Sequence, residues 1–228
     1  MSRTLNVVRM QFVNKLTYIW VPLLVLVGAF VLTLLVFSLI PGDGVKVGGG
    51  TQAPLWYFLV VGVQSLTLTF PFSQAMSVTR REFYLGTLLA ATVTAAMLSV
   101  IFVIGGLVEQ ATNGWGMNGY FFYLDGLWAA GPFGALLSYF VIAMLFFITG
   151  FWAATIYKRF GNLWLTIVLV ALGLVFVGLL WLAGRLDAWA EIGAWLAAQG
   201  ALGMTLWGVV LGVVLAGASF LTLRRAIP

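Results

Sequence analysis

Cysteine and histidine are both absent from this 228-residue chain, and charged residues make up only 7% of it. Their absence excludes disulfide frameworks, zinc sites built on these residues, cysteine or serine–histidine nucleophilic pairs and histidine pH switches. A soluble domain carries about 25% charged residues. Because 63% of the residues are hydrophobic, most of the chain must have lipid as its solvent. The composition predicts an all-α membrane protein with no separate soluble domain.

Six apolar stretches are long enough to cross a bilayer. A helix needs about 20 apolar residues to span a hydrocarbon core about 30 Å thick. The first stretch is too long for a cleaved signal peptide and has no small-residue cleavage site close behind it. The chain is therefore predicted to form one six-helix transmembrane domain over residues 18–228, with spans at 18–40, 54–76, 87–108, 130–157, 163–184 and 200–223.

Basic residues are distributed unevenly between the connecting segments. With the N-terminus inside, only Lys46 and Arg185 fall outside. The cytoplasmic side then holds Arg3, Arg9, Lys15, Arg80, Arg81, Lys158, Arg159, Arg224 and Arg225. Since Lys and Arg in short loops set orientation, both termini are predicted to be cytoplasmic in the plasma membrane. The acids agree, because only Glu82 falls inside, whereas those outside are Asp43, Glu109, Asp125, Asp187 and Glu191. The basic residues form no patch, which argues against a nucleic-acid partner.

Two flanking segments are predicted to lie at the membrane surface. In residues 1–17, Leu5, Val8, Phe12 and Leu16 recur at helical spacing with basic neighbours, a pattern typical of an amphipathic interfacial helix. A frayed extension of the first span is the alternative. On the outer side, apolar residues at helical spacing in 185–199 predict a short helix dipping into the membrane. The aromatic segment 109–128 is predicted to be an interface belt, with a substrate gate as the alternative.

The predicted spans contain no ionisable residue deep within a helix. A charge near the membrane midplane costs about 2.5–3.5 kcal/mol on insertion scales and is retained where a proton or ion pathway needs it. The sequence also contains no catalytic constellation, which argues against an enzyme. If this protein moves a substrate, the energy must come from another source.

The second span carries the most polar residues. Gln64, Thr67, Pro71 and Gln74 fall on one helix face, and Pro71 should kink the helix. This stripe is predicted to line a pathway or a helix contact. A second pattern, the small-residue series Gly208, Gly212 and Ala216 in the last span, should admit a close helix neighbour, either internal or from a second subunit.

The cytoplasmic connector between spans two and three is more organised than a simple positive anchor. Thr79 and Glu82 have the spacing of a capping box. We therefore expect a short charged helix here, with Phe83, Tyr84 and Leu85 offering apolar surface to a soluble partner.

The N-terminal interfacial helix, the six spans and the Arg-Arg-Glu-Phe-Tyr-Leu-Gly-Thr connector at 80–87 together resemble the ABC type-2 permease family. In that family the first cytoplasmic loop couples the permease to a separate ATPase, and two permeases form the pathway. The resemblance implies coupling contacts at Thr79, Arg80, Arg81, Glu82, Phe83, Tyr84 and Leu85.

The chain has no phosphate-binding loop, so the resemblance places ATP and Mg on the partner ATPase and no cofactor in this chain. The implied partners are that ATPase, a second permease copy or paralogue in a dimer, and membrane lipid. The implied function is an exporter for an amphiphilic or hydrophobic substrate such as a drug, lipid or peptide. The alternative is a non-transporting scaffold or immunity-type membrane protein. An ion-coupled carrier is disfavoured by the missing ionisable residues.

Overall fold

The computed structural model describes residues 3–13, 15–42 and 44–224. Among these residues six helices are long and apolar enough to cross a membrane, which confirms the predicted number of spans and the all-α class. They are Leu16–Leu39, Gly49–Ala75, Arg80–Ala111, Gly131–Phe160, Asn162–Arg185 and Trp189–Leu223. Asp43 and Arg225, which the orientation argument counts, lie outside the described residues, as do Met1, Ser2 and Asn14 of the predicted N-terminal helix.

The N-terminal segment forms helix α1 (Arg3–Val13), followed by a π-helical turn η1 (Leu16–Trp20) that runs into α2 (Val21–Leu39). Residues Val7 and Gln11 of α1 are almost fully buried, whereas Leu5 and Leu16 are largely exposed. The buried face is therefore not the predicted stripe. The reason is that α1 packs against α5 at Gly86, where a Cβ would collide with Val7.

The second span is divided into two helices, α3 (Gln52–Thr67) and α4 (Thr69–Ala75), after a short 3₁₀ turn η2 (Gly49–Thr51). The interruption at Leu68 lies three residues before Pro71. Proline has no N–H and its ring clashes with the carbonyl of the preceding turn. The helix is therefore interrupted on the N-terminal side of the proline, close to where the kink was predicted.

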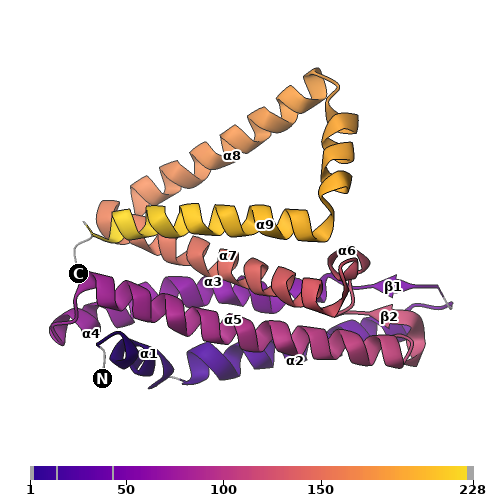
Figure 1. The fold of residues 1–228 in the computed structure, drawn as a ribbon, viewed down its shortest axis with the longest axis horizontal. Coiled ribbons are helices and arrows are strands. Elements are labelled where there is room, and N and C mark those ends of the chain that lie inside the picture. The colour runs from indigo at the N-terminus through magenta and orange to yellow at the C-terminus, as the bar shows by residue number, and fades with distance from the viewer. Residues whose placement is uncertain (1–2, 14, 43, 225–228) are drawn as a thin grey trace.

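The third span, α5 (Arg80–Ala111), leads into an irregular cap: η3 (Gly114–Asn118), strand β2 (Gly119–Tyr120) and the one-turn helix α6 (Asp125–Trp128). Strand β2 pairs in parallel with β1 (Lys46–Val47), with Lys46 opposite Gly119. Figure 1 shows this cap at one end of the bundle and α4 with both chain ends at the other. We refer to these as the β end and the α4 end.

The centre of the bundle is the contact between α3 and α7 (Gly131–Phe160). A Cβ at Gly62 would collide with the carbonyl oxygen of Phe147, and a Cβ at Gly150 with that of Leu59. These two glycines let the helix backbones touch, and Phe58 and Phe147 are fully buried beside them. Close backbone approach at small residues is how helices associate in lipid, where the hydrophobic effect between helices is lost.

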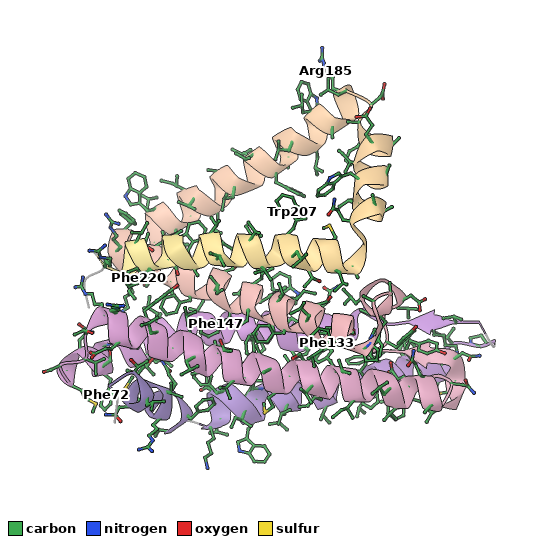
Figure 2. All side chains as sticks on the ribbon, viewed as in Figure 1. Phe72, Phe133, Phe147, Arg185, Trp207 and Phe220 are labelled. Atoms are coloured by element: carbon green, nitrogen blue, oxygen red, sulfur yellow. The ribbon has the colours of Figure 1, made fainter. Side chains whose placement is uncertain are left out.

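The last two spans stand apart from this core. Helix α8 (Asn162–Arg185) contains no buried residue and diverges from α9 (Trp189–Leu223), as Figure 1 shows. Gly200 interrupts α9 with φ 60° and ψ −174°, a backbone conformation that glycine adopts readily. The residues before it form the short helix that was predicted over 185–199, and Figure 2 places Arg185 at the apex, far from the bundle.

The small-residue series of the last span faces the chain's own helix α7. A Cβ at Gly208 would lie 2.9 Å from Cγ1 of Val141, and one at Gly212 would lie 3.6 Å from Cδ2 of Leu145. Of the two neighbours that the sequence allowed, an internal helix or a second subunit, the structure brings the internal helix to this face.

A bulky residue at either glycine of the α3–α7 contact should destabilise the protein. Gly62→Leu or Gly150→Leu forces the backbones apart, and overpacking typically costs about 1–3 kcal/mol. We expect a lower thermal unfolding midpoint in detergent, measured by fluorescence-detected size-exclusion chromatography. Gly178→Leu on α8 is the matched control, since no atom lies within 4 Å of its Cβ position. Equal midpoints for Gly62→Leu and Gly178→Leu would contradict the assignment of this contact as the core.

Candidate functional site at the connector before α5

The connector between α4 and α5 is a tight turn at the α4 end of the bundle. Ser77 has φ 56°, and its N–H donates to the carbonyl of Gln74 at 3.0 Å. The next residue is held on both sides: Val78 N–H donates to Ser73 O, and Gln74 Nε2 donates to Val78 O, both at 3.1 Å. The turn is thus held by its own hydrogen bonds.

The predicted capping box is confirmed. The Glu82 N–H donates to Thr79 Oγ1 at 3.3 Å, and Thr79 N–H donates to Glu82 Oε2 at 3.0 Å. The expected separate short helix, however, does not form, because Arg80 opens the 32-residue helix α5. The residue that could have ended a short helix, Gly86, instead packs against Val7 of α1, and the apolar pattern continues through it.

Two of the three apolar residues expected to face a partner are buried inside the chain. Phe83 is fully buried, with its ring edge against Phe70 at 5.2 Å between centroids. Tyr84 is also buried, and its hydroxyl donates to the carbonyl of Ala216 at 2.7 Å. Helix α9 and α4 take up these two side chains, so only Leu85 of the three is exposed. The surface left at the connector includes Phe72, Ala75, Met76, Ser77, Thr79, Arg81 and Leu85.

The two arginines of the connector have different surroundings. The guanidinium of Arg80 donates to the carbonyl of Arg224 at the C-terminal end of α9. A cation there satisfies a free helix carbonyl and interacts favourably with the helix dipole. Arg81 is exposed and extends the exposed face that continues along α5 with Leu85 and Leu89. Arg80 thus links two helices, while Arg81 is free to meet a partner or the headgroups.

The side-chain amide of Gln11, which the sequence analysis missed, is buried next to the connector. Gln11 is 1% exposed, and its Nε2 donates to Thr87 Oγ1 at 2.9 Å and Thr69 Oγ1 at 3.1 Å. Its Oε1 accepts from the Tyr18 hydroxyl at 2.9 Å. One side chain therefore connects α1, η1, α4 and α5. The available signal was a glutamine four residues after Val7, which places the two residues on one face of α1.

The predicted polar stripe does not act as one unit. Gln74 belongs to the connector, and Thr67 bonds back to the carbonyl of Val63 at 3.1 Å. Gln64 is half-buried, and no hydrogen bond of its side chain is present among the described residues. Pro71 is exposed. Gln64, Thr67 and Gln74 are half-buried along the second span, and a pathway or helix contact at this stripe stays a prediction.

Two grooves run along the last span. One, of about 490 Å³, lies between α7 and α9 near the β end, where the hydroxyls of Ser138 and Thr205 are 2.7 Å apart. The other, of about 310 Å³, lies between α5, α7 and α9. Gly208, Val141 and Leu145 line both grooves. The two grooves are therefore continuous, mostly apolar and open along the helices.

At the β end, Glu109 is fully buried in the last turn of α5, although the sequence placed it outside the span. Its Oε1 accepts from Trp115 Nε1 at 2.9 Å and from Phe121 N–H at 3.0 Å, and its Oε2 accepts from the N–H groups of Phe122 and Tyr123, both at 2.8 Å. Four uncharged donors therefore saturate the carboxylate. Glu109 fixes the aromatic segment from inside.

The aromatic segment is consequently not a simple interface belt. Phe121, Phe122 and Trp128 are buried, because Gly105 and Gly106 of α5 leave room for the rings of Phe122 and Trp128. The segment closes the β end of the bundle.

The fold defines the class of this protein as a polytopic α-helical membrane protein. No family model, no curated protein and no solved structure matches the chain. A function must therefore be inferred from the residues and contacts described above.

Replacing the buried carboxylate should loosen the closed β end. In Glu109→Gln the amide NH2 takes the place of one carboxylate oxygen and faces two N–H donors from which it cannot accept, and each unsatisfied buried donor costs about 1–3 kcal/mol. We expect a lower thermal midpoint and faster protease cleavage within 114–124 in detergent. Glu191→Gln, an exposed acid in the first turn of α9's outer part, is the control. An unchanged midpoint and cleavage rate for Glu109→Gln would rule out this role.

Proposed function

We propose that this chain is the membrane subunit of an ATP-driven exporter of the ABC type-2 permease class, powered by a separate ATPase that binds ATP and Mg. The observation that carries the proposal is the connector before α5. It is a turn stabilised by its own hydrogen bonds, with Arg81 exposed, at the end of the bundle where most basic residues lie. Exposed Met76, Arg81 and Leu85 give it both apolar and cationic surface.

The contacts of the connector give a mechanical reason for this role. Displacing Thr79 moves the start of α5, because the capping box fixes the two together. The same displacement reaches α9 through Arg80 and Tyr84, which bond to the carbonyls of Arg224 and Ala216. Helices α5 and α9 line the continuous grooves beside α7. A docked ATPase could thus change the grooves by moving one turn.

The substrate class follows from the grooves. Their linings are largely apolar with a few hydroxyls, which suits a drug, lipid or peptide with amphiphilic character. The grooves are open on the surface of one chain, and α8 has no buried residue. A second copy or a paralogue is proposed to complete the pathway.

An ion-coupled carrier has less support from this chain. Glu109 is a buried acid within a spanning helix, but each of its carboxylate oxygens already accepts two hydrogen bonds. A proton or cation would have to displace donors that hold the β end closed. The remaining alternative, a scaffold or immunity-type protein, uses the same connector surface and differs in having a partner that hydrolyses no ATP.

The orientation proposed here places the α4 end in the cytoplasm, because most basic residues gather there. A cysteine at Gly49, in the loop at the β end, should react with an impermeant maleimide added to intact cells. A cysteine at Asn162, exposed in the turn between α7 and α8, should react only after the cells are opened. Labelling of Asn162→Cys in intact cells would show that the orientation is the opposite of the one proposed.

Charge reversal at the connector tests the coupling itself. We expect the full chain, purified from its native membrane together with the partner ATPase, to show ATP hydrolysis by that partner, which Arg81→Glu should reduce at least tenfold. Reversing one member of a desolvated charge pair costs about 2–5 kcal/mol, whereas a rim charge matters little. Because Arg81 is outside the capping box, α5 should still begin at Arg80.

Lys158→Glu is the matched control, since it makes the same charge change at the same end of the bundle. Unchanged hydrolysis in Arg81→Glu would remove Arg81 as a coupling contact. A stable partner without ATP hydrolysis in the wild type would favour the scaffold.

A further inference from the structure

A cationic pocket and an apolar groove meet at the α4 end, where α8 diverges from the bundle. The pocket, of about 410 Å³, is lined by Arg159, Leu221, Thr222 and Arg224. The groove, of about 330 Å³, lies between α7, α8 and the end of α9 and is lined by Trp152, Ile156, Phe160, Trp164, Val168 and Thr222. Thr222 belongs to both, so the two sites are adjoining parts of one amphipathic depression.

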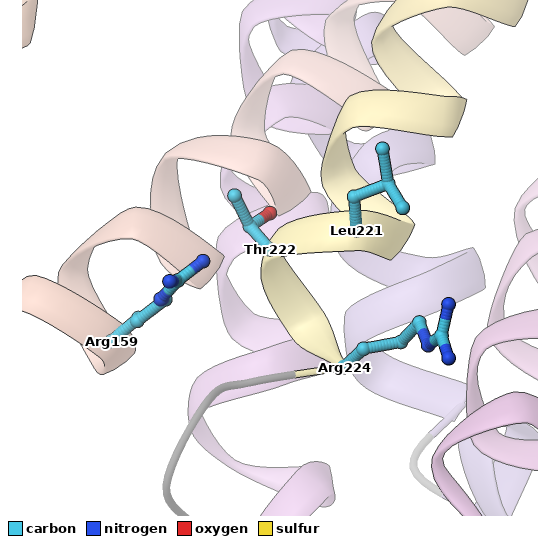
Figure 3. Close-up of a pocket in the computed structure, with 4 residues that line it drawn as sticks. All are labelled: Arg159, Leu221, Thr222 and Arg224. Atoms are coloured by element: carbon cyan, nitrogen blue, oxygen red, sulfur yellow. The ribbon is translucent and has the colours of Figure 1, made fainter.

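The charged part of this depression suits an anion. Figure 3 shows Arg159 extending from the end of α7 toward Thr222, whereas Arg224, the residue after α9, extends to the other side of its helix end. The Arg159 guanidinium lies over the ring of Phe160, 4.4 Å from its centroid, which restrains the side chain. Two arginines and a threonine in one pocket supply the positive charge and the N–H and O–H donors that the oxygens of a phosphate bind.

Few acidic groups compete for these arginines. Glu82 is the one acid that the sequence places among the segments of this end, and its carboxylate accepts from both N–H and Oγ1 of Thr79. Among the described residues, none that lines the pocket is acidic, so the pocket carries positive charge beside Thr222.

The apolar part of the depression suits a hydrocarbon chain. The groove exposes no polar surface, and it lies where the exposed helix α8 separates from α7. Its walls come from three helices, with Phe160 and Thr222 at the boundary with the cationic pocket. A ligand with an anionic head and an apolar tail can fill both parts at once.

We infer that this depression binds an anionic phospholipid, with the phosphate between Arg159 and Arg224 and one acyl chain in the groove beside Trp164. Basic pockets between transmembrane helices at the cytoplasmic surface are suited to such headgroups. The lipid fills the space between α8 and the bundle at this end. This inference goes beyond the proposed transport function and stands whether or not an ATPase docks at the connector.

Lipid binding by the purified, delipidated full chain tests the site. We expect phosphatidylglycerol to bind at least tenfold more tightly than phosphatidylcholine with the same acyl chains. Arg159→Ala combined with Arg224→Ala should abolish that preference. Arg185→Ala is the matched control, because Arg185 also stacks on an aromatic ring, Trp181, at 5.3 Å but lines neither part of the depression.

Glycerol 3-phosphate separates a lipid site from a site for a free phosphate compound. We expect it to bind at least tenfold more weakly than phosphatidylglycerol. Filling the groove by Val168→Trp should weaken phosphatidylglycerol and leave glycerol 3-phosphate unchanged. This variant also decides the matter if the double arginine variant fails to fold.

Three results would overturn the inference. The first is equal binding of the two phospholipids by the wild type. The second is unchanged phosphatidylglycerol binding in the folded arginine variant. The third is glycerol 3-phosphate binding as tightly as the lipid, with no effect of Val168→Trp.

Discussion

The close approach of α3 and α7 is the contact on which the rest of the structure depends. In lipid an apolar side chain gains little by leaving its surroundings for another helix, so association rests on close packing. Gly62 and Gly150 provide it, each placed where a Cβ would meet the other helix's carbonyl oxygen. With the backbones in contact, Phe147 and Phe151 fill the adjoining space and α5 packs alongside. The connector, the grooves and the closed β end are all positioned relative to this pair.

Hydrogen-bonded polar groups then hold the two ends of the bundle. Gln11 joins four segments at the α4 end, and Glu109 gathers the irregular aromatic segment at the β end. A polar group in an apolar interior is tolerated only when its partners are present, and a satisfied cluster fixes a unique arrangement. Between these ends α5 runs as one long helix. It therefore connects the turn at Thr79, before its first residue, to the segment around Phe121 at the β end.

Helix α8 differs from the rest in having no neighbour for most of its length. An apolar helix in lipid does not need one for solvation, since the lipid tails are as apolar as its side chains. The same divergence that leaves α8 exposed creates the depression with its two arginines at the α4 end. Proposed lipid binding and proposed pairing with a second copy therefore concern different parts of α8, one near Trp164 and the other along its remaining surface.

Composition and local pattern alone determined the class, the number of spans, the interruption before Pro71, the capping box at Thr79 and the short helix before Gly200, because each depends on residues close together in the chain. Contacts between distant segments could not be predicted from such patterns. The connector residues Phe83 and Tyr84 looked like surface until α4 and α9 were seen to cover them, and the bond from Gln74 to Val78 could not be foreseen from the polar stripe. Glu109 likewise read as a loop acid, since its four donors come from residues 115–123, which have no periodic signal. Sequence patterns report the faces of single helices, whereas only the tertiary structure decides which of those faces meet, because that choice depends on the close packing of glycines and rings that lie far apart in the chain.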